Sequence, residues 1–103
     1  VLVGDTLYLA GRLGLEDGQP PATATEEARI VLDSIRSVLS EAGMTMDNLV
    51  QIQVFCSDVS LYGEFNAVYQ EYFGERPPAR AFLGAGDLLF GARFEVMGIA
   101  VKE

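Results

Sequence analysis

Histidine is absent from the 103-residue sequence, and cysteine occurs once, as Cys56. Without histidine the chain cannot form a Ser-His or Cys-His nucleophile system, and it lacks a main ligand of zinc, so we expect no metal site. A single cysteine excludes an internal disulfide and indicates a reducing compartment, which predicts a cytoplasmic protein. Because Cys56 falls in a strand-like alternation, we interpret it as a small core residue.

Basic residues and long apolar runs are also scarce. Seven Lys and Arg residues stand against fifteen Asp and Glu residues, which gives a net charge of −8. The basic residues are scattered, whereas binding to nucleic acid or to an anionic membrane surface requires clusters of them, so we expect neither partner. No apolar run approaches the roughly 20 residues that a membrane span requires.

The remaining composition is typical of a small folded domain. Half of the residues are hydrophobic and 21% are charged, so we expect one domain, 1–103, with a modest core. The chain opens on Val1, Leu2 and Val3, which read as a strand, and has no initial methionine. We therefore expect the natural protein to have further residues upstream.

Two segments show helical periodicity. Thr23 and Glu26 predict a capping box at the start of the first helix, and Gly43 is its natural end. Its apolar stripe comprises Ala28, Val31, Leu32, Ile35, Val38, Leu39 and Ala42. The second predicted helix runs from about Ser60 to Phe73. Its stripe comprises Leu61, Phe65, Val68, Tyr69 and Tyr72.

Alternating segments predict the strands. Residues 1–3 pair with 6–13 as a hairpin, 49–57 form a third strand, and strands 79–83 and 92–102 are joined by a glycine-rich link. Strict alternation in 6–13 places Leu7, Leu9, Gly11 and Leu13 on one face and Tyr8, Ala10 and Arg12 on the other. The order ββ-α-β-α-ββ predicts an α+β fold, with one sheet covered on one face by two helices.

The last predicted strand is apolar on both of its faces. One face carries Phe94, Val96 and Ala100, and the other carries Met97, Ile99 and Val101. Because two helices cover only one face of such a sheet, the second face needs another apolar surface, and a second copy of the chain is the simplest candidate. We therefore expect a homo-oligomer.

Arg80 is the first candidate functional residue. It lies at the mouth of a strand, after Pro77 and Pro78, which stiffen the approach. A guanidinium can hold a carboxylate through two parallel hydrogen bonds, which orients the ligand as well as binding it. The alternative is a structural salt bridge to one of the acidic residues.

Glu95 is the second candidate. It is the one carboxylate in the apolar last strand, and an apolar setting favours the neutral form of a carboxyl group, which suits proton transfer near neutrality. The alternative is an outward-facing residue paired with Arg93 or Arg12.

With these features the chain resembles the RidA/YjgF family of reactive-intermediate deaminases, over nearly all of its length. The segments that carry the resemblance are Leu9-Ala10-Gly11-Arg12, Glu41-Ala42-Gly43, Val50 to Asp58, Phe65-Asn66-Ala67-Val68-Tyr69, Tyr72-Phe73, Pro78-Ala79-Arg80 and Phe94 to Val101. Each segment is weak evidence alone, but their order and spacing together are specific.

The resemblance implies a chorismate-mutase-like fold, a homotrimer and clefts between its subunits. Active members hydrolyse 2-imino acids, and enamine tautomers such as 2-aminoacrylate, to 2-keto acids and ammonia without a metal or organic cofactor. Arg80 matches the arginine that pairs with the substrate carboxylate, and Glu95 matches the glutamate that positions the attacking water. Gly11 matches a glycine whose backbone lines the cleft, and Asn66 matches a recurrent helix asparagine.

The chain departs from the family pattern at Ala10, Arg12 and Phe82, where the family usually has Ser, Gln and, in some members, Cys. The segment 84–91 also differs from the usual Leu-Pro-Lys-Gly turn. Arg12 and Phe82 fall among the expected substrate-binding residues, and Arg12 could add a second cation to the cleft or bridge to a neighbouring subunit.

These departures leave two alternative functions open. One is a non-catalytic binder of small keto or amino acids on the same scaffold, and the other is a chaperone-like interaction protein. An endoribonuclease role has been attached to some relatives, but the acidic charge and the absence of histidine disfavour it.

Overall fold

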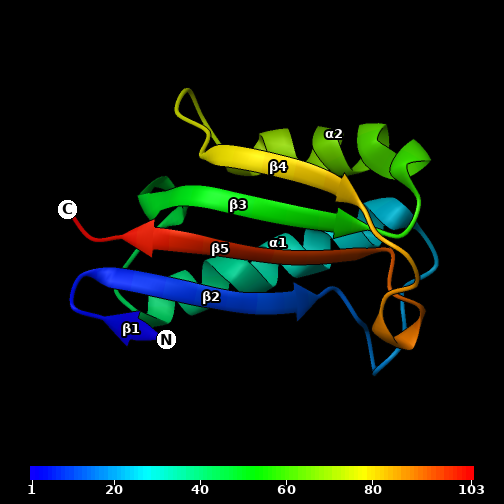
Figure 1. Ribbon diagram of the computed structural model, residues 1–103, viewed down its shortest axis with the longest axis horizontal. Coiled ribbons are helices and arrows are strands. Elements are labelled where there is room, and N and C mark those ends of the chain that lie inside the picture. Colours follow the sequence, from blue (N-terminus) through cyan, green and yellow to red (C-terminus); the bar gives the residue numbers. More distant parts are fainter.

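The computed structural model describes all 103 residues and shows a five-stranded sheet with two α-helices (Figure 1). The strands are β1 (Leu2–Val3), β2 (Thr6–Leu13), β3 (Leu49–Cys56), β4 (Ala79–Gly84) and β5 (Phe94–Val101). The α-helices are α1 (Ala24–Glu41) and α2 (Tyr62–Tyr72), and the 3-10 turns are η1 (Met46–Asn48), η2 (Val59–Leu61) and η3 (Leu89–Gly91). The predicted elements are thus confirmed, except that a 3-10 turn replaces the first residues of the second helix.

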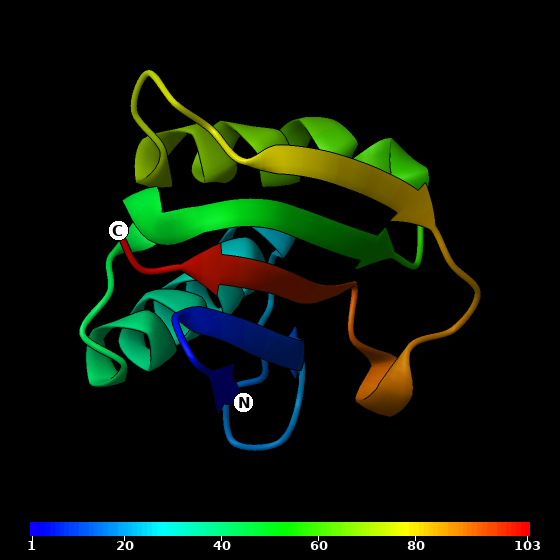
Figure 2. The ribbon, with the colours of Figure 1, turned by 60° about the vertical axis from the view of Figure 1, so that its left-hand side comes forward.

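The sheet is mixed, with the strand order β1-β2-β5-β3-β4. The neighbours β3 and β4 are parallel, because α2 crosses over between them, and the other neighbouring pairs are antiparallel. β4 is an edge strand, whereas β5 lies at the centre and is paired on both sides. Both helices lie on the same side of the sheet (Figures 1 and 2), which confirms the predicted architecture.

The core lies between this helical layer and the sheet. The fully buried apolar residues of α1 are Ala28, Val31, Leu32, Ile35 and Leu39. The side chain of Thr23 caps α1 by accepting a hydrogen bond from the Glu26 N–H at 3.1 Å. The carboxylate of Glu26 accepts from the Thr23 hydroxyl at 3.0 Å rather than from its backbone N–H, so half of the predicted capping box forms. Cys56 is fully buried, as expected for a core residue, and burial raises the pKa of its thiol.

The opposite face of the sheet has no covering layer in this chain. Along β5 every second side chain from Phe94 is buried, whereas Met97 remains 37% exposed and Ile99 and Val101 are half-buried. On β2, Tyr8 lies opposite Ile99 and is 48% exposed. On this open face β5 therefore presents an apolar row of Met97, Ile99 and Val101, as the pattern of the last strand predicted. Neither helix is long and apolar enough to cross a membrane.

A β-bulge interrupts β2 and overturns the predicted alternation. Leu9 lies opposite Gly98, but Arg12 lies opposite Val96. Two residues of β2, Ala10 and Gly11, therefore face the single residue of β5 that lies between Val96 and Gly98. The extra residue reverses which side chains point to which face. Arg12 consequently shares the helix-covered face with the buried Val96, and the prediction that Gly11 shares a face with Leu7 and Leu9 was wrong.

Candidate functional site

Arg80 lies on the edge strand β4 and is paired with Ile52 of β3, which is buried. Since paired residues point to the same face of a sheet, the side chain of Arg80 lies on the helix-covered face, next to α2. Its Nη1 donates a hydrogen bond to Asn66 Oδ1 at 2.9 Å, and its Nη2 donates to the hydroxyl of Tyr62 at 3.2 Å. The guanidinium carbon lies 4.4 Å from the centroid of the Tyr69 ring, a cation–π distance. The three partners are four and three residues apart on α2 and so share one face of the helix.

All partners of Arg80 are electrically neutral. The ion pairs of the chain join Arg29 to Glu71, Arg36 to Asp33 and Arg93 to Glu27. The alternative prediction of a structural salt bridge at Arg80 is therefore not what the structure contains. A guanidinium has five N–H donors, and the two contacts above leave others available to an anionic ligand. Arg80 is thus a positive charge that no carboxylate of its own chain neutralises.

A surface pocket lies beside Arg80, with a volume of about 410 Å³, which is in the range of small-molecule sites. Its lining consists of Asn66, Tyr69, Gln70, Pro77, Pro78 and Arg80. Tyr69 is only 5% exposed, and its hydroxyl has no hydrogen-bond partner. Burial raises the pKa of Tyr69, and the nearby Arg80 charge has a smaller, opposite effect.

Phe82 shares the helix-covered face with Arg80 but does not line this pocket. Its ring packs against Tyr62 at 5.0 Å and Phe65 at 5.6 Å between centroids, both edge-on. Phe82 thereby supports Tyr62, the tyrosine that holds Arg80. Phe82 packs against the core and is not a wall of the pocket.

Glu95 and Gly11 form a second cluster, on the open face. Glu95 is half-buried and lies opposite Leu13 on β2 and Phe55 on β3. A Cβ atom at Gly11 would overlap Glu95 Oε2 and would lie 3.0 Å from Glu95 Cδ. The carboxyl group therefore rests directly on the backbone of the bulge, and only glycine leaves room for it.

The predicted ion-pair partners of Glu95 are engaged elsewhere. Arg93 Nη1 pairs with Glu27 at 2.9 Å, and Arg12 Nε donates a hydrogen bond to Ser34 Oγ of α1 at 2.6 Å. Because of the bulge, Arg12 lies on the opposite side of the sheet from Glu95. Within one chain it therefore does not join Gly11 and Glu95.

Arg80 and Glu95 are likewise kept apart within one chain. β3 separates their strands, so the backbones are about 10 Å apart across the sheet. In addition, Arg80 faces the helices and Glu95 faces the open side. The structure thus contains two clusters, which we call the Arg80 group (Tyr62, Asn66, Tyr69, Arg80) and the Glu95 group (Gly11, Glu95). Sequence reasoning did not assign Tyr62 to the Arg80 group, although its spacing from Asn66 and Tyr69 on one helix carried that signal.

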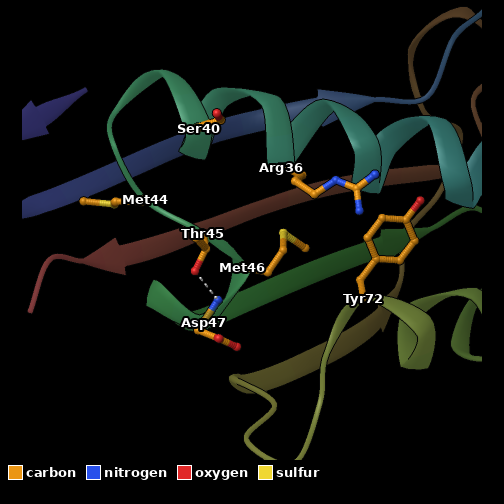
Figure 3. A pocket seen from close by; sticks show the side chains of 7 residues that line it. All are labelled: Arg36, Ser40, Met44, Thr45, Met46, Asp47 and Tyr72. Carbon is orange, nitrogen blue, oxygen red and sulfur yellow. Dashed lines mark hydrogen bonds between the residues drawn. The ribbon is translucent and has the colours of Figure 1, made fainter.

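A different pocket, of about 340 Å³, contains none of the predicted residues (Figure 3). Its lining consists of Arg36, Ser40, Met44, Thr45, Met46, Asp47 and Tyr72. Arg36 stacks over the Tyr72 ring at 5.0 Å and is paired with Asp33 at 2.8 Å (N to O). Because this guanidinium is already neutralised, the pocket is a weaker anion site than the one beside Arg80.

The chain is similar to known proteins over nearly all of its length. A protein-family model described as "Endoribonuclease L-PSP" matches residues 1–102. Proteins named 2-iminobutanoate/2-iminopropanoate deaminase are 35% identical in Rattus norvegicus and 37% identical in Bos taurus, over 99% of this chain and 77% of theirs. A RutC family protein of Sulfurisphaera tokodaii is 30% identical over 99% of this chain and 84% of its own.

Solved structures give the same result for the fold. The YjgF gene product of E. coli superposes with a TM-score of 0.93 at 27% identity, covering 100% of this chain and 85% of that chain. RidA from Psychrobacter sp. PAMC 21119 also has a TM-score of 0.93 at 27% identity, with 99% and 85% covered. The family match over nearly the whole sequence and the shared fold together show that this chain belongs to the RidA/YjgF family, described as endoribonuclease L-PSP.

Proposed function

We propose that the protein hydrolyses reactive 2-imino acids, and enamine tautomers such as 2-aminoacrylate, to 2-keto acids and ammonia. The observation that carries this proposal is the Arg80 guanidinium, which has only neutral partners and lies beside a pocket of suitable size. Support comes from relatives at 35–37% identity that are named for this chemistry. The net charge of −8 makes RNA an unfavourable substrate despite the description of the family model.

In this mechanism Arg80 binds the substrate carboxylate through two N–H groups, and Asn66 and Tyr62 hold the guanidinium in place. Glu95 orients a water molecule and accepts its proton as the oxygen adds to the imine carbon. This proton passes to the nitrogen, which gives a carbinolamine. The hydroxyl proton of that intermediate then moves to the nitrogen through Glu95, the C–N bond breaks, and ammonia leaves as the carbonyl forms. An imine carbon is already electrophilic, so orientation and water delivery account for the chemistry without a cofactor.

A complete site of this kind needs two subunits. The Arg80 group and the Glu95 group lie on opposite sides of the sheet in one chain, and the open face of the sheet presents an uncovered apolar row on β5. We place the active site in clefts between the subunits of a homotrimer, where Arg80 of one copy faces Gly11 and Glu95 of the next. Burial of Tyr8, Met97 and their neighbours provides the free energy of assembly. We further place the protein in the cytoplasm, where a free thiol such as Cys56 stays reduced.

The test is a coupled assay. A PLP-dependent serine or threonine dehydratase generates 2-aminoacrylate or 2-aminocrotonate, and keto-acid formation is followed with and without the protein. We expect acceleration by the wild type and a loss of at least about 100-fold in Arg80→Ala, since a bidentate charge-assisted contact contributes roughly 3 kcal/mol or more. Arg36→Ala is the matched control, because it removes an exposed guanidinium that is already paired with Asp33.

Sedimentation of the same variants completes the experiment. Arg80→Ala should sediment like the wild type, because Arg80 is proposed to hold substrate and not subunits. Loss of assembly in Arg80→Ala, or retention of its activity, would contradict the proposal. A wild type that binds 2-keto acids but accelerates no imine hydrolysis would favour the non-catalytic binder. Capture of unfolded proteins that is unaffected by Arg80→Ala would favour the chaperone-like alternative.

A further inference from the structure

Glu27, near the start of α1, is the only buried charged residue of the chain, and it is fully buried. Its Oε2 accepts hydrogen bonds from the backbone N–H groups of Arg93 at 2.7 Å and Phe94 at 3.1 Å. Its Oε1 accepts from Arg93 Nη1 at 2.9 Å. A carboxylate is very costly to bury unless such partners satisfy it, so these contacts hold the segment that enters β5 in one position.

Glu27 also contacts the end of β2. A Cβ atom at Gly14 would overlap the carbonyl oxygen of Glu27 and would lie 3.1 Å from its Cγ, so the chain leaving β2 packs directly on this residue. Gly11 lies three residues before this contact, and Glu95 directly follows the Phe94 amide that Glu27 binds. One buried residue, through its backbone and its side chain, therefore contacts the ends of both strands that carry the Glu95 group.

Arg93 extends the same connection. Its Nη1 donates a hydrogen bond to the carbonyl oxygen of Pro21 at 2.9 Å, and its Nη2 donates to that of Ala22 at 3.2 Å. Its own carbonyl oxygen accepts from the N–H of Ser57, just beyond β3, at 3.0 Å. The residue before β5 is thus fixed by the loop that precedes α1, by α1 itself and by the chain after β3.

The contact between Gly11 and Glu95 leaves no space for a further atom, so a small shift of β2 against β5 changes where the carboxyl group lies. We infer that Glu27 is a positioning residue of the reaction: through Gly14, Arg93 and Phe94 it sets the placement of Glu95 against Gly11. This inference rests on the role proposed above for Glu95. Glu27 itself, being fully buried, does not touch the substrate.

Two substitutions at Glu27 test the inference. Glu27→Gln keeps one oxygen for the backbone N–H groups of residues 93 and 94 but presents N–H donors to the Arg93 guanidinium. We expect kcat to fall roughly tenfold, with KM within about twofold of the wild type. Glu27→Asp is one methylene shorter and pulls the strand entry by about 1 Å, so kcat should fall on the order of 100-fold.

Leu39→Ala is the control for lost stability. Leu39 is fully buried near the other end of α1, twelve residues and about 18 Å along the helix from Glu27. Its truncation destabilises the core without touching β2 or β5 near the site. At a temperature where every variant is folded, kcat should be that of the wild type.

A second readout does not depend on turnover. The NMR chemical shifts of the Glu95 amide and carboxyl carbon should move in both Glu27 variants and stay in place in Leu39→Ala. The positioning role is overturned if kcat falls equally in Leu39→Ala, or if the Glu95 resonances of the Glu27 variants match the wild type. If the wild type hydrolyses no imine, the proposed function fails separately, and the Glu95 resonances alone decide whether Glu27 places that side chain.

Discussion

Gly11→Ala probes the Glu95 group with a single methyl group. The backbone of Gly11 is not in the left-handed region, so alanine adopts it without strain. The new Cβ would overlap Glu95 Oε2 and would lie 3.0 Å and 3.3 Å from Glu95 Cδ and Cγ. Since these atoms belong to the flexible end of a side chain, the carboxyl group must move while both strands keep their pairing.

The structure predicts a small loss of stability and a large loss of activity. Turning a side chain away from its preferred rotamer costs about 0.5–1.5 kcal/mol, so the free energy of unfolding should fall by about that amount. The carboxyl group must move on the order of 1 Å, and a displacement of that size costs roughly 100-fold in rate when the group orients a reactant. The affinity for a 2-keto acid should change little, because Arg80 provides the main contact with the carboxylate.

Gly63→Ala is the matched control. A Cβ atom there meets no other atom within 4 Å, and the residue lies in α2, so alanine should raise the free energy of unfolding by a few tenths to about 1 kcal/mol. Both variants are measured by urea unfolding and by the coupled deaminase assay. Wild-type kcat in Gly11→Ala would refute the argument that Glu95 must rest on the Gly11 backbone. A stability loss above about 3 kcal/mol would show that the strands, and not the side chain, move.

Two further substitutions test the individual clusters. Glu95→Gln keeps the shape of the side chain but cannot accept a proton, so kcat should fall by roughly 10²–10⁴-fold. The affinity for a 2-keto acid, measured by calorimetry, should stay nearly constant, and equal losses in kcat and affinity would remove the proton-transfer role. Tyr69→Phe removes a buried hydroxyl that has no partner, so the free energy of unfolding should be unchanged or rise by up to about 1 kcal/mol. Burial raises the pKa of Tyr69 above its ordinary value of 10.0, so the folded state holds the phenol proton more tightly than the unfolded state does. The free energy of unfolding is therefore unaffected by this ionisation below pH 10.0 and falls as the pH rises through the folded-state pKa. Unfolding curves should therefore show a steeper alkaline loss of stability in the wild type than in Tyr69→Phe, and parallel curves would contradict the shift.

Much of the fold could be predicted from the sequence, because its signals are local. The spacing of apolar residues between Ala28 and Leu39 needs only the helical period, and the two-sided apolar pattern of Phe94–Val101 needs only the strand period. The order of these elements then indicates one sheet covered on one face by two helices. Arg80 and Glu95 stood out for a similar reason, since each is a charge set in an otherwise apolar or rigid stretch.

Only the tertiary structure decided how the candidate residues are grouped. The bulge at Ala10 and Gly11 is a mismatch between two paired strands, so the alternation of one strand could not reveal that Gly11 meets Glu95 and Arg12 turns away. The Glu27–Arg93 pair joins residues that are 66 positions apart, and the two meet only because α1 packs against the start of β5. Charge and period are properties of the chain itself, whereas the face of the sheet that a side chain reaches depends on pairing with distant residues.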